Sequence, residues 1–179
     1  MSAEKKFVSW EEAVLWLKEQ SDQTDLVRDA YYDDPLLGAA ERYWSSLEWQ
    51  EVKDFLPAGE RALDIGAGRG IASYALAREG FEVTALEPDP SSVVGAAAIE
   101  NLAKEADLSI EVSKEFSEQL PFEDQQFDVV FARAVLHHTK DLGEACREIY
   151  RVLKPGGTFF AIRDHVISKS EASMYFPFA

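Results

Sequence analysis

The sequence has little cysteine and few basic residues, and both shortages exclude classes of protein. A single cysteine, Cys146, allows no disulfide within the chain. The 18 lysines and arginines against 33 aspartates and glutamates give a formal net charge of -15. This charge disfavours nucleic acid or an anionic membrane surface as a partner, because both repel an acidic protein. No apolar run approaches the roughly 18 residues that a membrane-spanning helix requires.

The rest of the composition is typical of a globular protein. The chain has 179 residues, 46% hydrophobic and 28% charged, which is enough for one domain with a sizeable core. The polar amino terminus does not resemble a secretory signal, so we expect a cytoplasmic protein. Cys146 falls at an apolar position of a helical stretch, which predicts a packed thiol and not a reactive one.

The first sixty residues are predicted to be helical. Ser9 and Glu12 have the spacing of a capping box, which starts the first helix. Proline and glycine at the end of the region stop the last helix. We therefore predict an amino-terminal helical cap over residues 1–57, with helices over residues 10–20, 24–32 and 36–55.

From Arg61 onward, short apolar runs alternate with helical stretches. Strands are expected over residues 62–65, 82–86, 109–112, 127–132 and 158–162. Helices are expected over residues 71–78, 91–106 and 142–153, the last closed by a turn at 154–157. This alternation predicts an α/β fold with a Rossmann-like, doubly wound and mainly parallel sheet of about five strands. The predicted core spans residues 58–179 as one compact unit.

The most informative stretch runs from Asp64 to Gly70, where an apolar strand passes into glycines at positions 66, 68 and 70. A strand, a glycine turn and a helix bring backbone N–H groups up to a small ligand. The spacing is G-x-G-x-G, whereas the dinucleotide fingerprint has two residues before its last glycine. Glu87 follows Gly66 by about twenty residues, the offset at which a carboxylate accepts hydrogen bonds from both ribose hydroxyls. These features predict a cofactor that contains a nucleoside.

Four motifs in this order resemble the class I S-adenosylmethionine-dependent methyltransferases, most of all the small-molecule branch with the ubiquinone and menaquinone methyltransferases. The motifs are Ala62–Gly70, the acid Glu87, Leu120-Pro121-Phe122 followed by Phe127-Asp128-Val129-Val130, and Arg151–Gly157. The resemblance covers about residues 58–164. It implies an enzyme that transfers a methyl group from S-adenosyl-L-methionine to a small-molecule acceptor and releases S-adenosyl-L-homocysteine.

The resemblance also assigns residues to the cofactor. Asp64 and the glycine loop would hold the methionine part, and Glu87 the ribose. The family usually has an acid four positions before the Leu-Pro pair, and Phe116 stands there instead. Its ring could stack on adenine with the Ser117 N–H reaching a ring nitrogen, or it could pack in the core. The residues assigned to the cofactor are Asp64, Gly66, Ala67, Gly68, Glu87, Pro88, Phe116, Ser117, Ala132 and Arg133.

The segment after the fourth strand would lie beside the reactive sulfonium and the acceptor. His137 or His138 could accept a proton there at neutral pH, or both could be structural residues of a loop. Adjacent histidines rarely point at one ion, so no metal site is expected. His165, past the fifth strand, is a candidate for contact with the acceptor. Tyr31 and Tyr32 could close over the cofactor or the acceptor, or belong to the core.

The carboxyl-terminal part is short for this family. Its enzymes normally continue past the fifth strand with a helix and two antiparallel strands, so strands six and seven would be missing. The fifth strand would then be an exposed edge, and a homodimer through that edge or through the carboxyl-terminal tail is a further prediction. The alternative is a module that binds S-adenosylmethionine without catalysing transfer. A nicotinamide-dependent oxidoreductase is opposed by the glycine spacing, and the sequence does not identify the acceptor.

Overall fold

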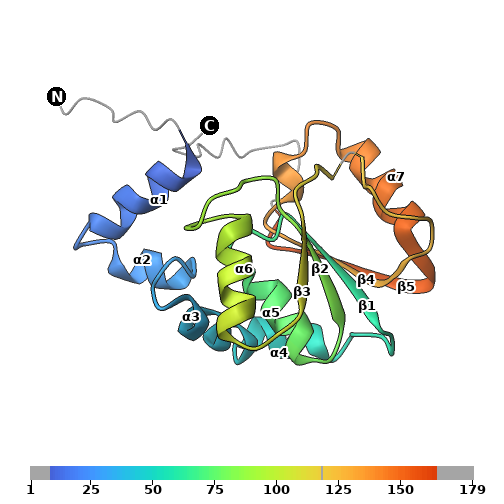
Figure 1. The fold of residues 1–179 in the computed structure, drawn as a ribbon, viewed down its shortest axis with the longest axis horizontal. Coiled ribbons are helices and arrows are strands. Elements are labelled where there is room, and N and C mark those ends of the chain that lie inside the picture. The colour runs from blue at the N-terminus through green and yellow to red at the C-terminus, as the bar shows by residue number, and fades with distance from the viewer. Residues whose placement is uncertain (1–8, 118, 165–179) are drawn as a thin grey trace, which may run out of the picture.

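The computed structural model describes residues 9–117 and 119–164. Its centre is a five-stranded sheet in the order β3-β2-β1-β4-β5, with all four strand pairings parallel (Figure 1). The predicted fold class, a Rossmann-like doubly wound sheet, is confirmed. The strands are β1 (Arg61–Ile65), β2 (Glu82–Leu86), β3 (Ile110–Ser113), β4 (Phe127–Arg133) and β5 (Leu153–Ile162).

The order of the strands fixes where a ligand can bind. The chain moves outward from β1 through β2 to β3, then returns to the other side of β1 for β4 and β5. Such a reversal opens a crevice at the carboxyl ends of the two strands beside it, which here are β1 and β4. These central strands are nearly all buried, whereas β3 at the edge is half-buried. Burial on both faces explains the short apolar runs of the sequence.

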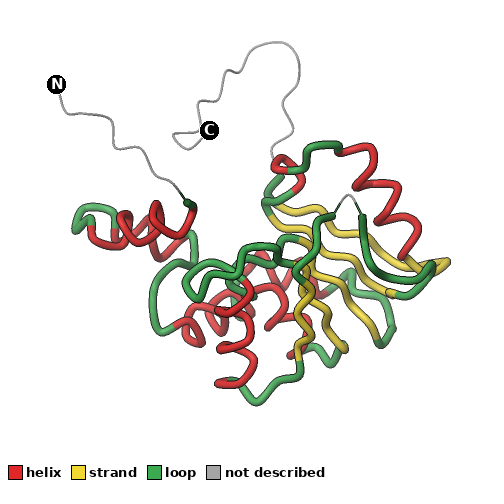
Figure 2. The backbone as a smooth tube through the Cα atoms, turned by 45° about the horizontal axis from the view of Figure 1, so that its top comes forward, coloured by secondary structure: helices red, strands yellow, loops and turns green. Residues whose placement is uncertain are grey.

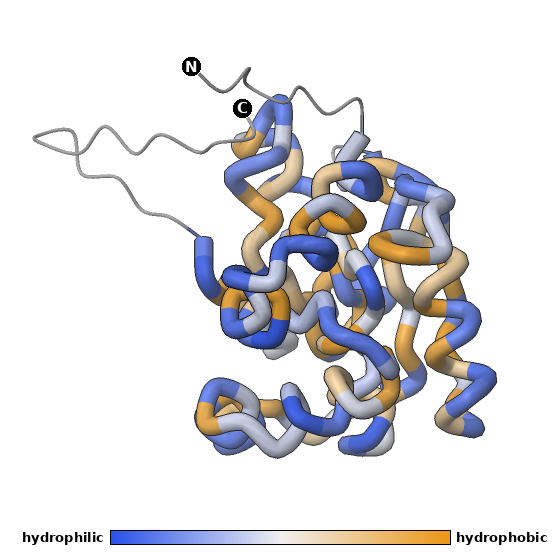
Figure 3. The backbone as a smooth tube through the Cα atoms, turned by 90° about the vertical axis from the view of Figure 1, so that its left-hand side faces the viewer, coloured by the Kyte–Doolittle hydropathy of each residue, from blue (hydrophilic) through white to orange (hydrophobic). Residues whose placement is uncertain are grey.

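Helices cover both faces of the sheet (Figure 2). One face carries α3 (Leu36–Trp44), α4 (Leu47–Lys53), α5 (Ile71–Arg78) and α6 (Ala96–Glu105), and the other carries α7 (Leu142–Val152). The aromatic side chains of Tyr43 and Trp49 pack with Leu76 and Phe131 on the first face. Helices α1 (Trp10–Glu19) and α2 (Thr24–Asp29) precede this layer. Hydrophobic and hydrophilic residues alternate along the helices, as expected of elements with one buried side (Figure 3).

The predicted helices differ from the observed ones at three places. The helix expected over 36–55 is two helices, because the Ser46 side chain accepts a hydrogen bond from Trp49 N at 3.2 Å and starts α4. The second helix ends early, since Tyr31 has a positive φ of 61°. The helix expected from residue 91 begins at Ala96, because Ser91 Oγ accepts from Val93 N and Val94 N in a turn.

Two further expectations are wrong. The fifth strand starts at Leu153, and the predicted turn at 154–157 lies inside it, where the register against β4 shifts. Cys146 is exposed and not packed, because it lies beside the buried stripe of α7. Within the ranges that the structure describes, no helix is long and apolar enough to cross a membrane.

Candidate cofactor site

The glycine loop connects β1 to α5 at the carboxyl edge of the sheet. Gly66, Gly68 and Gly70 have φ angles of 63°, 55° and 85°, a region that other residues rarely adopt. A Cβ atom on Gly66 would also lie 2.1 Å from a methyl group of Val135. The backbone N–H groups of Gly66 and Ala67 donate to the Leu86 carbonyl at 2.9 and 3.1 Å. The loop is therefore tied to the end of β2, where Glu87 follows.

Asp64 is a buried acid directly before this loop. Its side chain is 1% exposed, and one carboxylate oxygen accepts a hydrogen bond from Ser73 Oγ at 2.6 Å. Burial raises the pKa of Asp64 to about 7, and the nearby charge of Glu87 acts in the same direction. A cation beside Asp64 would favour its ionised form.

Glu87 is a second buried acid, bound to the glycine loop itself. Its Oε2 accepts from Gly68 N at 2.7 Å and its Oε1 from Asp89 N at 3.0 Å. Burial raises the pKa of Glu87, while these two backbone hydrogen bonds oppose the shift. A carboxylate has room for further hydrogen bonds on both oxygens. Glu87 thus lies where sequence reasoning expected a ribose-binding acid.

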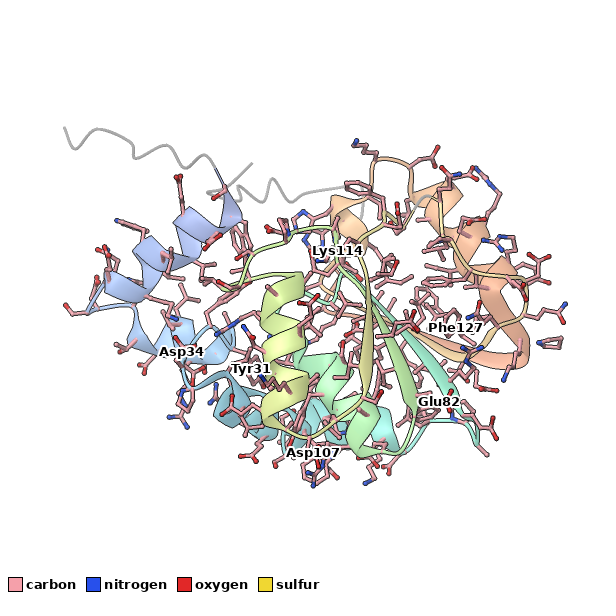
Figure 4. The ribbon with its side chains drawn as sticks, viewed as in Figure 1. Tyr31, Asp34, Glu82, Asp107, Lys114 and Phe127 are labelled. Carbon is pink, nitrogen blue, oxygen red and sulfur yellow. The ribbon has the colours of Figure 1, made fainter. Side chains whose placement is uncertain are left out.

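Arg69 fastens the amino-terminal segment to the glycine loop. Its Nη1 donates to the backbone carbonyls of Tyr31 and Asp33 at 3.0 and 3.2 Å, and its Nη2 pairs with Asp34 Oδ1 at 2.7 Å. Figure 4 shows Tyr31 and Asp34 beside the amino-terminal helices, away from Glu82 and Phe127 at the amino edge of the sheet. Sequence reasoning assigned Arg69 no role. The position of Arg69 between Gly68 and Gly70 was the one sequence feature that could have indicated a role at the site.

Tyr32 joins this group from the same segment. Its hydroxyl accepts a hydrogen bond from Trp10 Nε1 at 3.1 Å. Burial raises the pKa of Tyr32, and the charges of Arg69, Arg133 and Glu87 also act on its hydroxyl. The tyrosine therefore lies within electrostatic reach of the glycine loop and of the end of β4.

Arg133, the last residue of β4, extends the site toward β5. Its Nε pairs with Glu48 Oε1 at 2.7 Å, and the other oxygen of Glu48 pairs with Arg163. Among the described residues, two buried guanidinium nitrogens have no hydrogen-bond partner, Arg69 Nε and Arg133 Nη2. Buried donors of this kind are costly unless a ligand or water accepts from them.

The two histidines lie in a single turn of 3-10 helix, Leu136–His138, after β4. His137 Nδ1 is 3.1 Å from Asp164 Oδ1, which also accepts from Leu136 N at 2.9 Å. The His138 ring lies against His137 with ring centres 4.1 Å apart. Burial lowers the pKa of His138, with the charge of His137 as a second cause. The sequence predicted no role for Asp164, although it lies two positions after the end of β5, the strand beside β4. His165 lies outside the described residues.

The remaining predicted residues surround this group. Phe116 is 61% exposed, so the alternative that it packs in the core is wrong. Lys140 Nζ lies 5.9 Å from the centre of the Phe116 ring, and Ser117 beside it is half-buried. Pro88 is half-buried after Glu87, and Ala132 is fully buried in β4.

The fold and these contacts define a class of protein. A doubly wound parallel sheet, a glycine loop after β1 and a buried acid after β2 are the features by which Rossmann-like proteins hold nucleoside cofactors. The chain belongs to the family described as "Methyltransferase domain", which matches residues 63–161, more than half of the chain. The predicted resemblance to the methyltransferases is thereby confirmed.

Individual proteins agree with the family. A ubiquinone biosynthesis O-methyltransferase of Methylobacterium sp. (strain 4-46) is 36% identical over 104 residues, which are 58% of this chain and 41% of that protein. The chain therefore spans about two fifths of the length of this curated relative, and 39% of the next. A crystal structure from Methanococcus maripaludis, assigned provisionally to the S-adenosyl-L-methionine-dependent methyltransferases, matches with a TM-score of 0.59 and 25% identity. That match covers 90% of this chain and 66% of the other.

A third match has another activity in its name. The crystal structure of SpnF, a cyclase, matches with a TM-score of 0.55 and 28% identity over 70% of this chain and 44% of that one. Proteins with this fold therefore carry more than one kind of chemistry.

Proposed function

We propose that this chain transfers a methyl group from S-adenosyl-L-methionine to a small-molecule acceptor. The observation that carries the proposal is the pair of buried acids, Asp64 and Glu87, on either side of the glycine loop in a member of the methyltransferase domain family. The matching structure named for S-adenosyl-L-methionine supports the cofactor. The relative named for ubiquinone biosynthesis supports a small molecule as the acceptor.

The residues of the site fit this cofactor. The cofactor has a sulfonium and an ammonium group, and Asp64, whose pKa burial raises to about 7, ionises more readily beside a cation. The carboxylate of the cofactor's methionine part suits the unpartnered guanidinium nitrogens of Arg69 and Arg133. Glu87 has free acceptor positions for the ribose hydroxyls. The proposed cofactor contacts are those named from the sequence, with Phe116 and Ser117 near the adenine, together with Arg69.

The chain's part in the reaction is positioning and proton removal. When bound, S-adenosyl-L-methionine would supply an electrophilic methyl carbon: the acceptor's lone pair would form the new bond to this carbon, and the C–S bond would break with its electrons left on sulfur. Holding the acceptor in line can account for about 7–11 kcal/mol of barrier reduction in favourable cases. For a hydroxyl acceptor, we propose that His137, oriented by Asp164, accepts the proton, with His138 as the second candidate.

Calorimetric titration with S-adenosyl-L-homocysteine tests the cofactor assignment. We expect binding by the wild-type chain and a loss of about tenfold or more in affinity for Glu87→Ala, since charged hydrogen-bond acceptors contribute about 1.5–3 kcal/mol. Glu82→Ala is the matched control, because Glu82 is exposed at the start of β2, whereas Glu87 follows the end of that strand. No binding by the folded wild type, or equal affinities of both variants, would reject the proposal.

A second candidate is a module that binds the cofactor without transferring its methyl group. The match to a cyclase favours this candidate, because that protein has a similar fold but is named for a reaction other than methyl transfer. A chain that binds S-adenosyl-L-homocysteine but releases no S-adenosyl-L-homocysteine from S-adenosyl-L-methionine with phenolic, carboxylic or amine acceptors would agree with this candidate.

The partners predicted from the sequence stay part of the proposal. The net charge of -15 opposes nucleic acid, and a cytoplasmic enzyme acting on a small molecule agrees with the composition. β5 pairs with β4 and ends the sheet among the described residues, which supports a homodimer through that edge. Sedimentation of a monomer at high concentration would reject the dimer.

A further inference from the structure

A cavity of about 540 Å³ is lined by Tyr31, whose carbonyl accepts a hydrogen bond from Arg69 of the glycine loop. Three arginines from three parts of the chain line it: Arg28 at the end of α2, Arg42 in α3 and Arg163 after β5. Its volume lies within the range of about 300–1,000 Å³ that is typical of small-molecule sites. Three guanidinium groups around one cavity are unusual in a chain with 18 basic and 33 acidic residues.

The positive charge of this cavity exceeds the negative charge around it. Asp33 pairs with Arg42 through both oxygens, but Glu48 serves two guanidinium groups, those of Arg163 and Arg133. Arg28 is exposed and takes part in none of the ion pairs between described residues. Within residues 9–117 and 119–164, Asp29 is the only acid that lines the cavity. The arrangement therefore leaves guanidinium capacity for an anion.

Tyr31 connects the cavity to the cofactor site. Its φ of 61° is in the left-handed region, which costs a non-glycine residue roughly 1–2 kcal/mol. In this conformation its carbonyl accepts from Arg69 of the glycine loop, and its ring centre lies 5.1 Å from the guanidinium carbon of Arg42 and 5.4 Å from that of Arg133. Tyr31 therefore lines the cavity and also contacts the glycine loop and the last residue of β4.

We propose that this cavity binds an anionic group, a carboxylate or a phosphate, of the small molecule that receives the methyl group. The inference rests on the proposed function and adds the chemical class of the acceptor. Arg28 and Arg163 supply the charge. The Ser46 hydroxyl, which accepts from Trp49 N, keeps its own proton for a hydrogen bond to the anion.

Nuclear magnetic resonance titrations of the full chain test the proposal with benzoate and phenyl phosphate as probes and benzyl alcohol as the neutral analogue. We expect shifts of the Tyr31, Ser45 and Ser46 amides with at least one anion and none with the alcohol. The double variant Arg28→Gln/Arg163→Gln should bind the anion about tenfold more weakly, as expected for lost charged hydrogen bonds. Arg147→Gln, which removes one positive charge from exposed α7, should bind it as the wild type does.

Titration with S-adenosyl-L-homocysteine separates this inference from the proposed function. The double variant should bind S-adenosyl-L-homocysteine with wild-type affinity. Normal binding of it without any anion-induced shift at these amides would overturn the inference and leave the proposed function intact. Loss of both ligands in the double variant would assign the cavity to the carboxylate of the cofactor and overturn the acceptor assignment. A wild type that binds no S-adenosyl-L-homocysteine would remove the proposed function and this inference with it.

Discussion

Asp64 is buried, and its ionisation in the folded protein is therefore costly. Its pKa is raised from 3.8 to about 7 because the carboxyl group is buried with one hydroxyl partner and a second acid nearby. In the folded state the group therefore keeps its proton over a pH range in which the unfolded chain loses it. The stability from this proton is complete below about pH 3.8 and is lost as the pH rises through about 7.

Replacing Asp64 by asparagine should remove this pH dependence. The amide keeps an oxygen for the Ser73 hydroxyl and carries no charge. We expect Asp64→Asn to be more stable than the wild type at pH 8, by an amount on the order of 1–4 kcal/mol, and to lose this advantage toward pH 4. Urea unfolding at a series of pH values measures it. A difference that stays constant with pH would contradict the raised pKa.

A second prediction concerns the pKa of His138. Burial lowers its pKa, followed by the charge of His137, while the Asp164 carboxylate acts against both. Asp164→Asn should therefore lower the pKa of His138 further, as followed by proton resonances of the ring. Asp124→Asn, at the amino edge of the sheet, is the control with the same change of charge. An unchanged titration of His138 in Asp164→Asn would show that the charge of Asp164 does not act on the His138 ring.

At the scale of elements, the segment between α2 and α3 is held on the glycine loop by a single side chain. Arg69 is 7% exposed and reaches two carbonyls and one carboxylate of this segment. This contact joins parts of the chain that are more than thirty positions apart, which explains why local patterns do not show it. It also places Tyr31 and Tyr32 at the site.

Substitution of Arg69 should loosen this attachment. We expect Arg69→Gln to destabilise the fold by about 1–3 kcal/mol, the range for buried polar groups left without a partner. It should also weaken binding of S-adenosyl-L-homocysteine, because Tyr31 and Tyr32 would no longer be fixed. Arg147→Gln breaks an exposed pair instead and should leave the free energy of unfolding nearly unchanged, because exposed ion pairs contribute little to stability. Equal unfolding midpoints of the two variants in urea would contradict the role of Arg69.

Local sequence features predicted the elements, and long-range contacts limited what could be predicted beyond them. Apolar runs and glycines located all five strands and the loop at Gly66–Gly70, because these signals are local. The break between α3 and α4 was missed, since apolar periodicity continues across Ser46, whose hydroxyl caps the new helix. The pairing of Arg133 with Glu48 spans 85 positions, and no local pattern indicates it.

In the molecule as a whole, the described candidate residues lie at the carboxyl edge of the sheet, and the amino edge serves as an internal control. Asp64 lies near the end of β1, and the segments after β1, β2, β4 and β5 carry the glycine loop, Glu87, His137 and His138, and Asp164. At the opposite edge lie Arg61 and Lys154, which line a separate polar cavity of about 520 Å³. We propose that the cofactor binds at the carboxyl edge and not at the amino edge.

The most direct test is to locate bound S-adenosyl-L-homocysteine by amide resonances of the isotope-labelled chain. We expect shifts at Gly66, Gly68, Gly70 and Glu87, and no shift at Arg61 or Lys154. NADH should not reproduce the pattern, because the glycine spacing differs from the dinucleotide fingerprint. Shifts confined to the amino edge, or a folded chain whose glycine-loop amides do not respond, would rule out a cofactor site at the carboxyl edge.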